Sequence, residues 1–427
     1  MHNKISFITN VGINNLEYLK LLLKSLKENL HYTHHEIIVF IDRDNEGIYE
    51  YLKSIKSDFY DLKIVTHKFP TNYVGYQLNI NILVELAKYD IVSYLQSDMV
   101  ISKNYDLNIL EDLEDKCILS ATRIEPPLHP TSDKTFTMNF GDSPSNFKFE
   151  EFVKYSEEVK SNKVITYFFA PFTFYKKYWQ QVGGHDSIFR RSREDSDILQ
   201  KFLHADIKIK QTFKANVYHF TCVSSRGNDW FNTNNIQAKK KVELQQTADW
   251  IELKKFIRNW GGFNHGEEKL IKYDVHLQVQ NSKNFDLELL QNIEPYFSKV
   301  WVDDTNQRNS IVEKLTEYED TVPNELCEIS KNDWDITKKY YNTTDYNSIF
   351  VCGTPINYKC LIIVNSTASF NASHLLEIVK NLTAVIENYE IGDYDYNGIK
   401  IIIKEKCKIS NLISKNPNIE TGLIQIE

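Results

Sequence analysis

The sequence contains no long hydrophobic run. No stretch of about 18 apolar residues occurs in it, so we expect no transmembrane segment. The start, MHNKISFITNVG, has one short apolar run that is typical of a strand and unlike a secretory signal. These absences predict a non-secreted protein of the cytoplasm.

The sequence has fewer basic than acidic residues. The 50 Lys and Arg residues stand against 58 Asp and Glu residues, which gives a formal net charge of −8. Because a nucleic-acid binder needs a basic field to hold the phosphate backbone, nucleic acid is not expected as a partner.

Cysteine is scarce, and its spacing is irregular. The six cysteines show no CxxC pair, which argues against a zinc site and against a disulfide framework. Buried reduced thiols are favoured for Cys117, Cys222, Cys327, Cys352, Cys360 and Cys407.

Strand and helix patterns alternate from the start of the chain. A length of 427 residues, with 42% hydrophobic and 25% charged residues, is typical of a globular protein of two domains. Apolar strands are predicted at 4–11, 36–44, 63–69 and 90–99, each separated from the next by a helical pattern. This order predicts a parallel sheet, in which ligands bind beyond the carboxyl ends of the strands. Those ends carry Thr9, Asn10, Asp42 and Asp98.

The pattern continues to a break near GGFNHGEE (261–268), where glycines and charges interrupt it. Before the break, residues 126–163 show little periodicity and are interpreted as a substrate loop or a disordered insertion. We expect an α/β domain over 1–262, with a helical extension at 230–260. A smaller α+β domain is expected over 268–427, with no assigned role and a possible part in oligomer contacts.

Five motifs follow one another in a fixed order. They are YLQSDM (94–99), TRIEP (122–126), GGHD (183–186), REDSD (193–197) and YHF (218–220). Together they resemble glycosyltransferase family 2, the inverting enzymes with the GT-A fold, and the resemblance covers roughly residues 4–226. It implies a hexosyltransferase-like enzyme that transfers a sugar from a nucleotide-diphosphate sugar, with a UDP-sugar favoured. The acceptor would be a hydroxyl group of a glycan or another molecule.

The resemblance also implies roles for individual residues. Asp195 matches the family's catalytic base, and Glu194 lies beside it. Asp98 matches the acid that binds metal and diphosphate, and His219 the histidine that completes the metal shell. The donor-binding candidates are Thr9, Asn10, Asp42 and Asn79 at the nucleoside, and Gln96, Ser97, Arg123, Glu125 and Arg226 at the rest of the donor.

One departure from the family bears on the metal. Members of the family usually present two acids at this motif, whereas this chain has Gln96 and Ser97 before Asp98. A divalent cation, Mn²⁺ or Mg²⁺, is the implied cofactor, because hard cations take oxygen ligands and leave positions for substrate phosphates. With one acid fewer, dependence on that cation stays open.

Each candidate residue has a structural alternative. Glu194 and Asp195 could simply complement a helix dipole, although an inverting displacement needs only one well-placed carboxylate. His219 could be a packed core residue, and Arg226 a solvated loop arginine that does not close over the diphosphate. Arg123 and Glu125 could form a buried ion pair, and the aromatic run over 167–174 could be core and not a sugar platform.

Two other functions compete with sugar transfer. A catalytically degenerate GT-A domain would bind sugar or nucleotide without turnover, and the replaced acid at Ser97 motivates it. A nucleotidyltransferase on a similar sheet would usually carry a glycine-rich basic loop after the first strand, which TNVGINN lacks.

Overall fold

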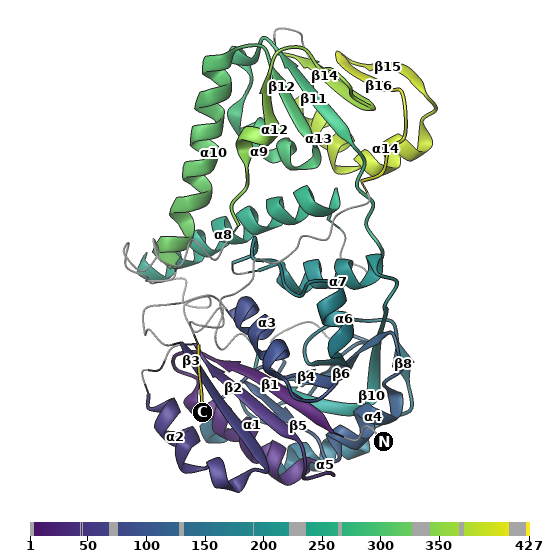
Figure 1. The fold of residues 1–427 in the computed structure, drawn as a ribbon. Helices are drawn as coiled ribbons and strands as arrows, with labels where there is room; N and C mark the ends of the chain where they lie inside the picture. The colour runs from purple at the N-terminus through teal and green to yellow at the C-terminus, as the bar shows by residue number, and fades with distance from the viewer. Residues whose placement is uncertain are drawn as a thin grey trace.

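The computed structural model describes residues 4–42, 44, 46–67, 76–127, 132–190, 192–221, 236–263, 267–326, 342–366, 371–409 and 424–427. It contains two sheets, each covered by helices (Figure 1). The larger sheet has the order β17-β3-β2-β1-β4-β9-β6-β10-β5, with β7 paired to β6 and β8 to β10. This arrangement confirms the predicted α/β fold.

The larger sheet is built from residues of the first half of the chain and one strand from the C-terminal end. Its strands are β1 (Ile5–Val11), β2 (Glu36–Ile41), β3 (Asp61–His67), β4 (Ile91–Tyr94), β5 (Met99–Ile101), β6 (Cys117–Glu125), β7 (Phe136–Thr137), β8 (Val164–Ile165), β9 (Phe172–Tyr175), β10 (Lys208–His219) and β17 (Ile424–Ile426). Its helices are α1 (Leu16–Asn29), α2 (Ile48–Ser54), α3 (Tyr76–Leu86), α4 (Tyr105–Asp112), α5 (Phe149–Glu158), α6 (Lys176–Gln181) and α7 (Glu194–His204).

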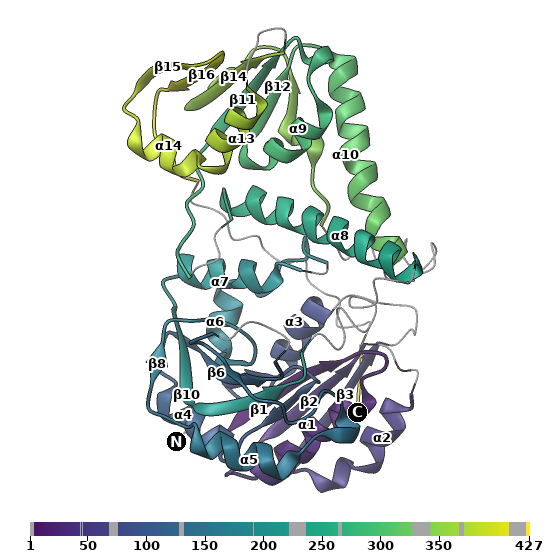
Figure 2. The same ribbon diagram turned by 180° about the vertical axis from the view of Figure 1, so that it is seen from behind.

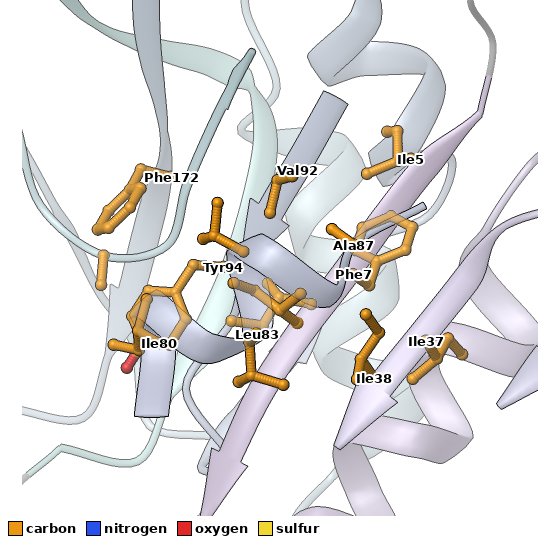
Figure 3. Packing of buried hydrophobic residues seen from close by; sticks show 14 of the residues in the cluster. Ile5, Phe7, Ile37, Ile38, Ile80, Leu83, Ala87, Val92, Tyr94 and Phe172 are labelled. Atoms are coloured by element: carbon orange, nitrogen blue, oxygen red, sulfur yellow. The ribbon is translucent and has the colours of Figure 1, made fainter. Parts of the chain in front are cut away.

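Strands β3, β2, β1 and β4 pair in parallel, as the alternating pattern predicts. Their residues are nearly continuous apolar runs because helices cover both faces of a parallel sheet. Figure 3 shows the packing at the centre, where Ile80 and Leu83 of α3 lie over the strands near Phe7 and Tyr94. The carboxyl ends of these strands are thereby held on a rigid base.

The rest of the larger sheet is mixed. Strand β9 is antiparallel to both β4 and β6, and β5 is antiparallel to β10. The stretch 126–163, interpreted from the sequence as a loop or disordered insertion, instead contains helix α5. Its apolar side chains Phe149 and Phe152 pack in a cluster with Tyr218, so α5 is held in place by aromatic burial.

The smaller sheet has the order β13-β12-β11-β14-β16-β15. Its first four strands are parallel and the last two antiparallel. The strands are β11 (Val275–Gln280), β12 (Lys299–Val302), β13 (Phe350–Cys352), β14 (Cys360–Asn365), β15 (Gly392–Tyr396) and β16 (Ile399–Ile403). The helices are α9 (Leu287–Ile293), α10 (Thr305–Leu326), α12 (Tyr346–Ile349), α13 (Ala372–Lys380) and α14 (Leu382–Asn388).

The long helix α8 (Ile236–Trp260) lies between the two sheets, as both views show (Figures 1 and 2). Its Trp260 packs with Phe189 on the side of the larger sheet, whereas Ile257 belongs to the core of the smaller one. Strand β17 returns to the larger sheet and pairs with β3. No helix in the described ranges is both long enough and apolar enough to cross a membrane.

Candidate active site

Four predicted donor-binding residues gather at the ends of β1 and β2. The Asn79 amide nitrogen, on α3, donates to Asn10 Oδ1 at 3.2 Å and to Asp42 Oδ1 at 3.0 Å. The Thr9 hydroxyl and Asn79 Oδ1 are buried and make no hydrogen bond to any described residue. Buried polar atoms normally have partners, so these two mark the cluster as a candidate ligand site.

His67 belongs to the same cluster, and sequence reasoning missed it. It ends β3, its Nε2 lies 3.9 Å from Asp42 Oδ1, and its ring packs edge-on against Phe40. Both ring nitrogens are buried without a hydrogen bond to any described residue. The sequence could have indicated His67 by its place at the end of the third parallel strand. In the β2–β3 register Ile41 pairs with Thr66, so the residues that follow them, Asp42 and His67, lie side by side.

Asp98 and His219 are brought together by the turn between β4 and β5. The Asp98 carbonyl accepts a hydrogen bond from the Phe220 backbone N–H, and His219 pairs with Met99 in the β10–β5 register. As a result His219 Nε2 lies 3.8 Å from Asp98 Oδ2. Both side chains are buried, so the pair forms a buried polar contact near the ends of the strands.

Glu125 contacts the other ring nitrogen of the same histidine. Its Oε1 lies 2.8 Å from His219 Nδ1 and 3.4 Å from an Arg123 guanidinium nitrogen. Nδ1 thus contacts Glu125 while Nε2 faces Asp98, and a carboxylate at one ring nitrogen is the arrangement found where a carboxylate orients a metal-binding histidine.

Arg123 is the basic group of the site. It is buried, donates to Gln96 Oε1 at 3.3 Å, and lies with its guanidinium carbon 3.7 Å from the centre of the Phe169 ring. Burial lowers the pKa of Arg123, while the charges of Glu125, Asp195 and Asp98 act in the opposite direction. Asp98 and Asp195, which are 97 positions apart, therefore lie within electrostatic reach of one guanidinium.

Glu194 and Asp195 open helix α7 directly after Arg193, whose φ of 70° turns the chain sharply into the helix. Burial raises the pKa of Asp195, and the charge of Arg123 lowers it in part. The pKa of Glu194 is raised well above its ordinary value by burial and by the charge of Asp195. A carboxylate with a raised pKa is a stronger proton acceptor than an exposed one.

Some aromatic residues of the run 167–174 lie in the core, and one lies at the site. Phe172 and Phe174 are fully buried, as the core alternative states, whereas Phe169 is 38% exposed and covers Arg123. Ser97 is buried beside Asp98. Arg226 lies outside the described residues. Within the described ranges, no group of three or more His, Cys, Asp or Glu side chains is placed to hold a metal ion.

The fold and site thus define an α/β domain whose strand ends carry a polar cluster, an acid–histidine pair and a partly buried carboxylate. Residues 13–179 match the model of glycosyl transferase family 2. This match confirms the resemblance over that part of the chain. The matched range includes Asp42, Asn79, Asp98 and Arg123, while Asp195 and His219 lie beyond its end. No curated protein matches the chain.

Solved structures similar to the chain include glycosyltransferases. One is TarS of S. aureus, at 14% identity over 79% of this chain and 55% of TarS, with a TM-score of 0.40. Residues 1–349 of TarS in complex with UDP match at 14% identity over 80% of this chain and 94% of that one, with a TM-score of 0.39. The mannosyltransferase PcManGT of Pyrobaculum calidifontis, in complex with GDP-Man and Mn²⁺, matches at 12% identity over 58% of this chain and 64% of that one, with a TM-score of 0.36. The chain therefore spans about half the length of full-length TarS.

Proposed function

We propose that this protein is an inverting hexosyltransferase that uses a nucleotide-diphosphate sugar, with a UDP-sugar favoured. Asp195 accepts the proton of the acceptor hydroxyl, whose oxygen attacks the anomeric carbon. The bond from that carbon to the diphosphate breaks, and the nucleoside diphosphate leaves. The observation that carries the proposal is the buried cluster at the strand ends, in which Asp98 lies 3.8 Å from His219 and Glu125 contacts both His219 and Arg123.

The nucleoside would occupy the cluster at the ends of β1, β2 and β3. The Asp42 carboxylate can accept the imide N–H of uracil, and its position is fixed by Asn79. Thr9, Asn79 and His67 offer buried atoms without hydrogen bonds to described residues, and these suit a polar base edge.

The diphosphate would lie near Asp98. A divalent cation fits here, because Asp98 offers a carboxylate oxygen and His219 an imidazole nitrogen 3.8 Å away, and substrate phosphates and water can complete the shell. When bound, the cation would neutralise charge on the departing diphosphate. Ser97 adds no carboxylate, so we expect weaker metal binding than in members of the family with two acids.

Asp195 is suited to act as the base because it is half-buried with a raised pKa at the helix start. In a single displacement, one carboxylate on the face opposite the leaving group is enough. Glu194 is more deeply buried, and its pKa is raised well above its ordinary value by burial, by Asp195 and by the charges of Glu252 and Asp249, so we assign it a supporting role.

Thermal melting with UDP, GDP, dTDP or CMP, each with and without Mn²⁺, tests the donor site. A nucleotide at 100 times its dissociation constant should stabilise the protein by about 2.7 kcal/mol. We expect the largest shift with UDP and Mn²⁺, and we expect Asp98→Ala to remove the part that needs metal. A shift of equal size in Asp98→Ala would overturn the role of Asp98.

Turnover is tested by release of nucleoside diphosphate from UDP-glucose, UDP-N-acetylglucosamine and GDP-mannose, with water as acceptor. Asp195→Asn should lower the rate by about 10²–10⁴-fold, the usual contribution of a general base. Asp206→Asn is the matched control, since Asp206 follows α7 on the exposed surface. Nucleotide binding with no release in the wild type would favour the degenerate, non-catalytic domain.

A further inference from the structure

Helix α8 buries several charged side chains between the two sheets. Glu252, Lys254 and Lys255 are each at most 4% exposed, on a helix that lies between the sheets (Figure 1). Buried charges are costly unless they are paired and hydrogen-bonded, so the partners of these groups define what α8 holds in place.

On one side, α8 holds the chain segment that leads into the proposed base. Lys255 Nζ donates to the Ile188 carbonyl at 2.9 Å, and Glu252 Oε2 accepts from the Arg190 backbone N–H at 2.8 Å. Just after the base, the Trp260 indole N–H donates to Asp197 Oδ1 at 2.8 Å. Helix α8 thus holds backbone atoms before Glu194 and Asp195 and the Asp197 side chain after them.

On its other side, α8 pairs with elements of the smaller domain. Lys255 Nζ lies 3.5 Å from Glu319 Oε1 on α10, and Lys254 Nζ lies 3.3 Å from Glu294 Oε1. Glu319 in turn accepts from the Thr344 backbone N–H at 3.3 Å. One side chain, Lys255, therefore contacts both the segment before α7 and the helix α10.

We propose that Lys255 is a positioning residue for sugar transfer, which joins the smaller domain, through Glu319, to the segment that places Asp195. This inference rests on the proposed role of Asp195 as the base. It gives the smaller domain a function in catalysis, namely to hold the entry to α7 at the correct distance from the donor site.

The reasoning is geometric. Asp195 sits on the first turn of a helix, and its distance from the acceptor hydroxyl depends on where that turn begins. A displacement of about 1 Å at a reacting group can lower a rate by about 10²-fold. Without Lys255, the Ile188 carbonyl and the carboxylates of Glu252 and Glu319 lose their shared cation, so this segment and α10 would separate.

Lys255→Met tests the proposal, with Lys254→Met as the matched control. Both lysines are buried on the same helix, but the ion pair of Lys254 goes to Glu294 in the smaller domain. We expect Lys255→Met to lower kcat for nucleoside diphosphate release about tenfold or more, with the dissociation constant of UDP changed less than about twofold. Lys254→Met should keep kcat within about twofold of the wild type.

Equal kcat values for the two variants, or a loss of UDP affinity in place of kcat, would overturn the proposal. If Lys255→Met does not fold, Glu319→Gln replaces it as the test variant. It removes only the charged partner of Lys255 in the smaller domain. A wild-type kcat in Glu319→Gln would then overturn it. The proposed function fails separately: it is wrong if Asp195→Asn keeps wild-type turnover, whatever the Lys255 variant does.

Discussion

At the scale of single residues, the charge of Arg123 links the donor side of the site to the proposed base. Burial raises the pKa of Asp195 and Arg123 lowers it, so the two effects together set the pH at which the base loses its proton. The acid limb of turnover should therefore lie above the pH expected for an ordinary aspartate. Arg123→Gln should move this limb to higher pH, as measured by nucleoside diphosphate release from pH 4 to 8. Asp206→Asn should leave the limb in place, and a limb that Arg123→Gln does not move would contradict the proposed coupling.

His185 gives a second pH effect, on stability. It is fully buried beside Trp179, and burial lowers its pKa to about 3 from an ordinary value of 6.5. Below pH 6.5 the unfolded chain takes up a proton that the folded one refuses, so the stabilising contribution is complete above 6.5 and is lost as the pH falls toward 3.

We therefore expect the free energy of unfolding to drop between pH 6.5 and pH 4, and His185→Gln to show a flatter profile in urea titrations over that range. The exposed His34→Gln is the control and should keep the wild-type slope. Parallel profiles for His185→Gln and the wild type would show that another group causes the acid loss.

At the scale of elements, the C-terminal strand β17 completes the edge of the sheet that carries the nucleoside cluster. Ile424 pairs with His67 in the β17–β3 register and is 6% exposed, whereas Ile426 on the same strand is 48% exposed. Ile424→Ala should cost about 2 kcal/mol of stability, at the low end for a buried isoleucine because the strand is at an edge. Ile426→Ala, the matched control, should change stability by less than about 0.5 kcal/mol. Calorimetry with and without UDP measures both, and Ile424→Ala should also weaken UDP binding through His67.

The elements also show where sequence reasoning succeeds and where it does not. The parallel strands β1 to β4 follow from local apolar runs and helical spacing, and so do Thr9, Asn10, Asp42 and Asp98 at their ends. Strand β9, antiparallel between β4 and β6, and strand β17 depend on pairing between distant segments, which no local pattern records. For the same reason the contacts of Glu125 with His219, and the place of His67 beside Asp42, were visible only in three dimensions.

At the scale of the whole molecule, the two sheets share a buried ionic layer around α8. Glu294, at 0% exposure, pairs with Lys254 and Arg258 of α8, and its segment belongs to the smaller domain. This layer predicts that both parts of the chain unfold together in one calorimetric transition, because separating them would break several buried ion pairs at once.

Glu294→Gln tests this view of the molecule. The substitution keeps the shape of the side chain but leaves the charges of Lys254 and Arg258 without their shared partner, which for a buried pair costs about 3–5 kcal/mol. We expect that loss in calorimetry, together with division of the single transition into two. Glu288→Gln, at the exposed start of α9, should keep one transition and stay within about 0.5 kcal/mol of the wild type. If Glu294→Gln unfolds at the wild-type temperature in one step, apolar contacts such as those of Ile257 and Trp260 hold the two parts together, and the ionic layer serves only to position α8.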